Sequence, residues 1–319
     1  MTARTLLCAA AAALLVGCAA PAADASTVAP DPTATEVTAL DGTVVWVSGP
    51  AGAQTLMQHD AAGTRPVQGA PTARSYRSID LGHDRAGGLV LSYVRCPGTG
   101  ACAPRRDDLR GHRASFRGLA LTRCSLTTAP AVWRTNAAYG LLCRKRDGRT
   151  FDAARSGLYV KSDGRSPRRL PLPRAAVRDG ATSVTRADLR GTRVAAVAAD
   201  VYAYAFMETT AGTSMWSARV ATSEGDGDER AAAMALGTTA TLWTLTASSH
   251  AGDPNAARIS RLQGSCLTWQ TLTNPAGPDE AEGYPATALA ADTGTLYLVV
   301  PGTGVVTHEF APVRPNCPA

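Results

Sequence analysis

The polar residues that could do chemistry in this chain are few and widely spaced. Asp80 and Asp188 occupy corresponding places, each directly before a leucine (Leu81 and Leu189) that leads into a turn and an apolar segment. Arg134 follows an apolar run in a third segment of this kind. If these side chains converge, they could bind a polar ligand, and a pair of carboxylates could do general acid–base chemistry. The alternative role is structural, in which each side chain ties its strand to a neighbouring backbone.

Motifs that identify common enzyme classes are absent from the sequence. There is no G-x-S-x-G nucleophile elbow, no H-E-x-x-H, no P-loop and no G-x-G-x-x-G after a strand. The acidic run 224–229 could attract Ca²⁺, but it lacks the EF-hand spacing and predicts a solvated loop. The histidines are dispersed in polar or turn-like segments, which favours exposed turn residues over metal ligands: His59, His83, His112, His250 and His308. We therefore expect no metal, no cofactor and no catalytic set.

The cysteines predict disulfides and an oxidising compartment. Of the eight cysteines, Cys8 and Cys18 lie in the N-terminal segment, and an even set of six remains. A zinc site is the weaker alternative because no C-x2-C pair occurs. Six cysteines allow many pairings, and sequence order favours Cys96 with Cys102, Cys124 with Cys143, and Cys266 with Cys317. The first pair has the best support, since the Pro-Gly and Gly residues between its cysteines let the chain turn back.

The N-terminal segment resembles a bacterial lipoprotein signal. A positive charge at Arg4 precedes an apolar run at 5–14, which leads into Leu-Val-Gly-Cys at 15–18. A leucine three residues before a cysteine, with a small residue directly before it, is typical of a lipobox. The resemblance implies that residues 1–17 are removed and that Cys18 carries the lipid. The apolar run is shorter than the ~20 residues that span a bilayer, and an ordinary secretory signal is the alternative.

These observations predict a cellular location and a domain organisation. Residues 18–35 are rich in Ala, Pro, Thr, Ser and Asp without apolar periodicity, which predicts a lipidated, disordered tether. Residues 36–319 then form the folded domain, and a mature chain of about 300 residues suffices for one large all-β unit or two ordinary domains. We expect an extracytoplasmic protein, anchored to the cell membrane through its N-terminal lipid and monomeric.

The chain is basic, and the excess is uneven. The formal net charge is +6, and arginines gather between residues 105 and 178. Such a flank could meet an anionic envelope polymer or lipid headgroups, although a solvated arginine-rich surface is the simpler alternative. Nucleic acid is not expected as a partner, because the basic stretch has no interleaved aromatic residues and no recognisable binding motif.

A strand–turn–strand pattern recurs along the chain. Short strands end near residues 40, 81, 133, 189, 236 and 289, at spacings of about 40 to 56 residues, and each leads through a turn into an apolar strand. A more polar strand pair follows in several repeats, for example across Asp60–Gly63 and across Ser162–Gly164. Because Asp-Gly between alternating runs indicates a hairpin, each repeat is expected to form four antiparallel strands.

Four-stranded repeats of this length are typical of β-propeller blades. A single twisted sheet exposes two faces, and stacking sheets around an axis buries both. The run Pro130–Arg134 followed by Leu141-Leu142, with the recurring leucine–turn–strand unit, resembles the six-bladed TolB-type propellers, whose repeats have the form P-x-W-S-P-D-G. No repeat here has the full S-P-D-G core, so seven blades or a pair of sandwiches remain alternatives. The expected fold is an all-β propeller of six four-stranded blades.

The resemblance implies a binding or scaffolding role in the envelope, with an unknown protein or an envelope polymer as partner. In such a fold the inner strands line a central channel, and Asp80, Arg134 and Asp188 would be its polar residues. A lactonase-like or glycan-cleaving hydrolase or lyase with a site in that channel is the alternative. A purely structural spacer is a third possibility.

Overall fold

A computed structural model describes residues 26–119, 121–222, 229–237, 241–248, 257–263, 266–272, 286–310 and 314–316. The predictions made for Cys8, Cys18, Cys317, His250 and the acidic run 224–228 fall outside these residues. Within them 59% of the residues lie in strands, and there is one short helix, α1 (Arg174–Arg178). In the part of the chain that is described, no helix has the length and apolar character needed to cross a membrane.

The strands follow one another as short antiparallel hairpins. In chain order they are β1 (Thr27–Ala29), β2 (Val37–Leu40), β3 (Thr43–Ser48), β4 (Thr55–Asp60), β5 (Gly63–Pro66), β6 (Ser75–His83), β7 (Leu89–Cys96), β8 (Ala103–Asp107), β9 (Arg113–Ser115), β10 (Cys124–Leu126), β11 (Ala131–Trp133), β12 (Asn136–Cys143), β13 (Gly157–Ser162), β14 (Arg168–Arg169), β15 (Ser183–Arg190), β16 (Arg193–Ala199), β17 (Tyr202–Thr209), β18 (Ser214–Thr222), β19 (Glu229–Leu236), β20 (Leu242–Ser248), β21 (Ala257–Gln263), β22 (Cys266–Leu272), β23 (Ala288–Asp292), β24 (Thr295–Val300), β25 (Gly304–His308) and β26 (Arg314–Asn316).

Most strands belong to four-stranded meanders, in which each strand pairs with the next. The meanders β2–β5 and β15–β18 are separate sheets, and β19–β22 gains β26 at its outer edge. The meanders β6–β9 and β11–β14 are linked into one larger sheet through a single parallel pair, Trp133 with His83, and β10 also pairs with β12. This link is possible because Gly82 has no side chain: a Cβ there would lie 1.7 Å from the Val132 carbonyl oxygen.

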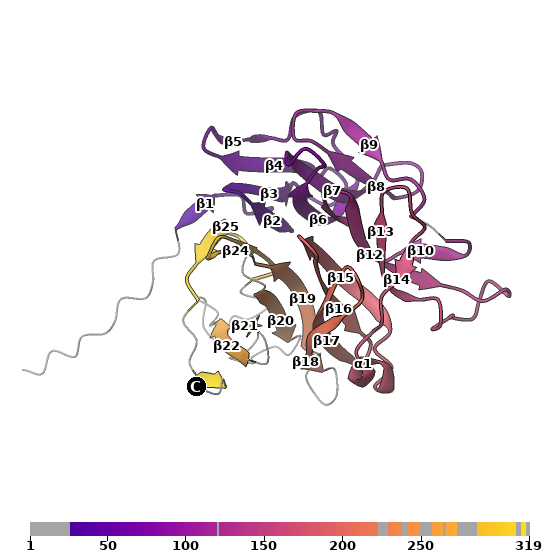
Figure 1. Cartoon of the computed structure of the whole chain (residues 1–319). Helices are drawn as coiled ribbons and strands as arrows, with labels where there is room; N and C mark the ends of the chain where they lie inside the picture. The colour runs from indigo at the N-terminus through magenta and orange to yellow at the C-terminus, as the bar shows by residue number, and fades with distance from the viewer. Residues whose placement is uncertain are drawn as a thin grey trace, which may run out of the picture.

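The first strands of the meanders contact one another in a closed cycle. β2 contacts β6, which contacts β11; β15 contacts β11 and β19, and β23 contacts both β19 and β2. The small sheets therefore stand around a common axis as in a β-propeller (Figure 1). The all-β propeller prediction is confirmed, and the strands expected around residues 40, 81, 133, 189, 236 and 289 are all present.

The predicted tether is wrong in its extent. Thr27–Ala29 form β1, which pairs with β25 and completes the sheet of β23 and β24. Ala29 is buried, and the Asp31 carboxylate accepts a hydrogen bond from the indole Nε1 of buried Trp46 at 2.8 Å. The open edge of β25 offers backbone groups that a passing extended segment can satisfy. Three strand residues are too few to show a sequence period, which is why composition alone suggested disorder.

The core lies between neighbouring meanders. One cluster joins Leu40 and Val45 of the first meander to Tyr76, Leu81 and Tyr93 of the second. Comparable clusters join the other neighbours around the ring. Since a sheet gains burial only where another sheet covers its face, each meander depends on both of its neighbours.

Glu208 on β17 gives the fold a measurable pH dependence. It is 1% exposed, and its Oε2 atom has no hydrogen-bond partner among the described residues. Burial raises the pKa of Glu208 to about 7, although Arg168 opposes the shift. A raised pKa in the folded state means that this carboxyl favours folding at low pH. That contribution is lost as the pH rises from the unfolded value through about 7.

We predict that Glu208→Gln stabilises the protein at pH 8, by up to about 3 kcal/mol, and has little effect at pH 5. At pH 8 the variant removes a buried charge, whereas at pH 5 the native carboxyl is already neutral. Urea unfolding at both pH values measures the difference, with the exposed Glu309→Gln as control. Equal effects of Glu208→Gln at the two pH values would contradict the prediction.

Candidate functional site

The structure brings Asp80 and Asp188 together at the centre of the ring and places Arg134 elsewhere. A cavity of about 60 Å³ lies between the inner strands, and its polar lining comes from Thr38, Asp80, Thr128, Arg186, Asp188 and Arg190. This volume has room for a few water molecules. The proximity of the two carboxylates follows from their shared position in two repeats.

Polar side chains near the axis tie several meanders to the next one in the ring. They accept hydrogen bonds from backbone amides of the following inner strand or turn: Leu81 N donates to Thr38 Oγ1 at 3.0 Å, Leu236 N to Asp188 Oδ2 at 2.7 Å, and Gly42 N to Asp292 Oδ2 at 2.7 Å. The Val132 amide donates to the Asp80 carboxyl in the same way. The structural role considered for Asp80 and Asp188 is therefore present in the molecule, and their role in ligand binding stays a prediction.

The two central carboxyls differ in their tendency to ionise. Burial raises the pKa of Asp80 well above its ordinary value, and the nearby Asp188 raises it further, while Arg190 and one amide act in the opposite direction. Burial also raises the pKa of Asp188, but Arg190 and the amides of Leu236 and Leu189 offset part of that effect. Because Asp188 has more donors, Asp80 holds its proton to the higher pH.

Arg190 is the central residue that sequence reasoning missed. Its Nη2 donates to the carbonyl oxygens of Ala39 on β2 and Ala291 on β23, both at 2.9 Å, so it bridges the first and last meanders. Its Nε and Nη1 atoms, like Asp80 Oδ2, are buried without a hydrogen-bond partner among the described residues. The available signal was its place directly after Asp188-Leu189, at the end of an inner strand.

Arg134 lines a second and much larger pocket, a groove between the meanders β6–β9 and β11–β14. We call it the basic groove. Its volume is about 670 Å³, ten times that of the central cavity, and it is lined by Arg106, Arg113, Ala114, Ser115, Phe116, Arg117, Leu119, Val132, Arg134, Thr135, Asn136, Ala137, Lys161, Asp163 and Gly164. Five of these residues are basic and one is acidic, so the groove carries an excess of positive charge.

Most of the basic groups in this groove are available to a ligand. Arg106, Arg117 and Arg134 are exposed, and their guanidinium groups make no ion pair or hydrogen bond within the described part of the chain. Arg113 lies 3.7 Å from the Asp107 carboxylate, and the Lys161 ammonium donates to the Arg165 carbonyl oxygen at 2.8 Å. Guanidinium groups match the planar, two-oxygen geometry of carboxylates and phosphates, so the groove offers groups of the kind that bind anions.

Local backbone geometry places Arg134 in the groove. It lies in the tight turn between β11 and β12, at a φ of 55° that few non-glycine residues adopt. Its amide donates to the His83 carbonyl oxygen at 2.6 Å, which fixes the turn against β6. The sequence showed that basic residues gather between 105 and 178. It did not show which of them would face one another across two meanders.

A third pocket, of about 590 Å³, lies between the meanders β2–β5 and β6–β9, but its charges are largely used within the protein. The Arg65 guanidinium pairs with Asp60, His112 pairs with Asp108, and the Asp84 carboxylate accepts amide hydrogen bonds from its own turn. Among the described residues, no group of three or more His, Cys, Asp and Glu side chains is arranged to hold a metal.

Two of the three predicted disulfides are confirmed. Cys96 is bonded to Cys102, and Cys124 is bonded to Cys143 across β10 and β12. Cys266 is also disulfide-bonded. Its expected partner, Cys317, lies outside the described residues, so that pairing stays a prediction.

Comparison with solved structures shows likeness in fold. A protein of unknown function from Dyadobacter fermentans has a TM-score of 0.53 at 11% identity, covering 90% of this chain and 98% of its own. The β-propeller domain of the Trilobed protease from Pyrococcus furiosus has a TM-score of 0.46 at 8% identity, covering 90% and 86%. The SapL1 lectin in complex with alpha methyl fucoside has a TM-score of 0.48 at 9% identity, covering 90% and 96%. No protein-family model and no curated protein matches the chain.

We predict that Arg190→Met destabilises the protein by about 3 kcal/mol, because it removes two charge-assisted hydrogen bonds that join the first and last meanders. It also removes the cation nearest to Asp80 and Asp188. Urea unfolding at pH 7 measures the loss, and Arg193→Met, an exposed arginine on the next strand, is the matched control. A loss no greater than that of the control would show that the bridge contributes little.

Proposed function

We propose that this protein is an extracytoplasmic, lipid-anchored β-propeller that binds an anionic polymer of the cell envelope, with the basic groove as its ligand site. The observation that carries the proposal is the groove itself. It combines five basic side chains with one acidic side chain, and three of the guanidinium groups are unpaired among the described residues. A polymer with repeated carboxylate or phosphate groups would engage several of these cations at once, which suits binding without catalysis.

The position of the groove relative to the N-terminus supports a ligand at the membrane surface. Neighbouring turns follow one another along one face of the ring, which we call the turn face. Asp292 accepts from Gly42 at 2.7 Å, Asp41 lies 3.1 Å from His83, and the His83 carbonyl accepts from the turn at Arg134 that lines the groove.

The chain enters the propeller on this same turn face. Ser26 pairs with Thr307 at the end of β25. This end of β25 lies beside the start of β24. The start of β24 follows the turn after Asp292, which belongs to the turn face. Cys18 precedes Ser26 by only eight positions, a length of chain that spans at most about 29 Å. A lipid on Cys18 would therefore hold the turn face, and the groove with it, close to the membrane.

Two finer points belong to the same proposal. Taking the two linked meanders separately, and β23–β25 with β1 as one blade, gives a ring of six blades. Six blades fit the TolB-type resemblance, which implies a binding or scaffolding role in the envelope. The alternative of a hydrolase or lyase in the central channel has less support, because a cavity of about 60 Å³ is too small for a sugar or lactone substrate.

For the anchor, we predict that the N-terminal peptide of the mature protein begins at Cys18 and carries lipid. Mass spectrometry of that peptide tests the modification directly. Cys18→Ala should move the protein from the membrane fraction to the soluble extracytoplasmic fraction, because the tether then has no lipid. An unmodified cysteine in the membrane-associated protein would refute the lipid anchor.

For the ligand site, we predict that Arg117→Glu/Arg134→Glu weakens binding of polyphosphate and polygalacturonate by more than about tenfold at physiological salt. The variant reverses two charges that line the groove. Arg146→Glu/Arg149→Glu changes the net charge equally on an exposed loop outside it and should bind normally. Titration calorimetry at two salt concentrations measures both.

Equal weakening by the two double variants would mean that net charge, and not the groove, attracts the polymer. Crosslinking in intact cells adds a further test: recovery of a specific protein at Arg117 or Arg134, with no polymer, would replace the polymer by a protein partner.

A further inference from the structure

We infer that the Cys124–Cys143 disulfide is a positioning element of the basic groove. It fixes residues 116–119 and 121–123, which we call the wall segment because they form one wall of the groove, and ligand binding depends on that fixed wall. The inference rests on the proposed function, since it concerns the same site, but it assigns a role to residues that touch no ligand.

The wall segment lies close both to the groove and to the meander β11–β14. Phe116, Arg117 and Leu119 line the groove from this side. Gly118 lies against the side chain of Lys161 on β13, since a Cβ on Gly118 would be 3.4 Å from Lys161 Cε. Gly118 also has a φ of +64°, which glycine adopts without strain. The segment therefore lies against Lys161, one of the cations that line the groove.

Behind the wall lies a small apolar cluster that includes the disulfide. Leu119 is buried together with Tyr139, Leu141, Cys143 and Tyr159. Phe116, Leu121 and Cys124 pack against this cluster. The segment is thus attached to the meander β11–β14 through apolar side chains, two of which also line the groove.

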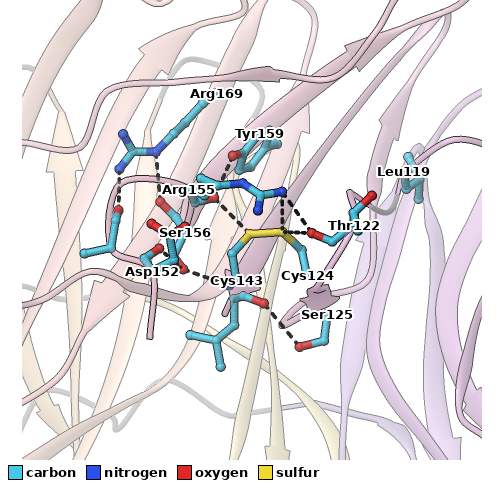
Figure 2. Close-up of a disulfide and its surroundings, with 12 residues drawn as sticks. Leu119, Thr122, Cys124, Ser125, Cys143, Asp152, Arg155, Ser156, Tyr159 and Arg169 are labelled. Atoms are coloured by element: carbon cyan, nitrogen blue, oxygen red, sulfur yellow. Dashed lines mark hydrogen bonds between the residues drawn. A yellow bond between two sulfur atoms is a disulfide. The ribbon is translucent and has the colours of Figure 1, made fainter. Parts of the chain in front are cut away.

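Three hydrogen bonds hold the segment to the same meander, and one of them joins backbone groups: the Arg144 amide donates to the Arg123 carbonyl oxygen at 2.9 Å. The Tyr139 hydroxyl donates to the Leu119 carbonyl oxygen at 3.2 Å. The Arg155 guanidinium donates to the Thr122 carbonyl oxygen at 2.9 Å and lies 3.8 Å from Cys124 Sγ. Figure 2 shows Arg155 reaching across the disulfide to Thr122.

The disulfide is the covalent part of this attachment. Cys143 is fully buried in β12, and its amide donates to Ser156 Oγ at 2.8 Å, so it is the fixed end. Cys124 belongs to β10, a strand of three residues, and is only half-buried. Without the bond, the segment would be held by a short strand and a few weak contacts, and ligand binding would have to order it.

The experiment uses the full chain and measures polyphosphate binding by titration calorimetry. We expect Cys124→Ala/Cys143→Ala to weaken binding about tenfold, because ordering freed side chains opposes association. The matched control is Cys96→Ala/Cys102→Ala, which removes a disulfide whose cysteines do not line the groove and should change affinity by less than about twofold. Hydrogen exchange of the wall segment should rise in the first variant and fall in the native protein when polyphosphate is added.

A folded Cys124→Ala/Cys143→Ala variant with native affinity would overturn the inference. If that variant does not fold, Arg155→Met decides: it keeps the disulfide but removes the bond to Thr122, and should weaken binding about threefold. Arg144→Met loses the same charge outside the groove and should bind normally; equal affinities of these two variants would also overturn the inference. If Arg117→Glu/Arg134→Glu binds normally, the proposed ligand site fails; if only the cysteine and Arg155 variants bind normally, the site stands without the positioning role.

Discussion

Closure of the ring is the constraint on which the rest of the structure depends. Each four-stranded meander buries its two faces only against its neighbours, so the first and last meanders must meet. Arg190, on a strand between them in sequence, donates to carbonyl oxygens on β2 and β23. At the rim, β1 pairs with β25. Inner and outer contacts thus join parts of the chain that are far apart in sequence.

The contrast between the centre and the groove separates stability from binding. At the centre, Asp188 and Arg190 bind backbone groups of neighbouring meanders, and burial raises the pKa of both Asp80 and Asp188. In the basic groove, Arg106, Arg117 and Arg134 are exposed, and their guanidinium groups lack partners within the described part of the chain. The charges that stabilise the ring and the charges proposed to bind a ligand therefore lie in different parts of the molecule.

The sequence predicted the features that recur within each meander. It did not predict the positions of side chains that depend on contacts between meanders. The strand–turn–strand unit located the inner strands, and the shared place of Asp80 and Asp188 correctly suggested ties to neighbouring backbone. Cys124 and Cys143 could be paired from sequence order. Arg134 was assigned to the channel, but its turn faces the groove, and Arg190 was overlooked because its acceptors lie about 100 residues or more away. Neither fact has a local sequence signal.

The pairing of β1 with β25 also sets an order of events during biosynthesis. Thr27 lies opposite Val306, so β1 has no partner until β25 has been synthesised. Contacts of such long sequence separation form late and slowly. Through most of synthesis, β1 would be attached to an open arc of sheets. The ring is complete only when β1 pairs with β25, so a chain that stops before β25 cannot complete it.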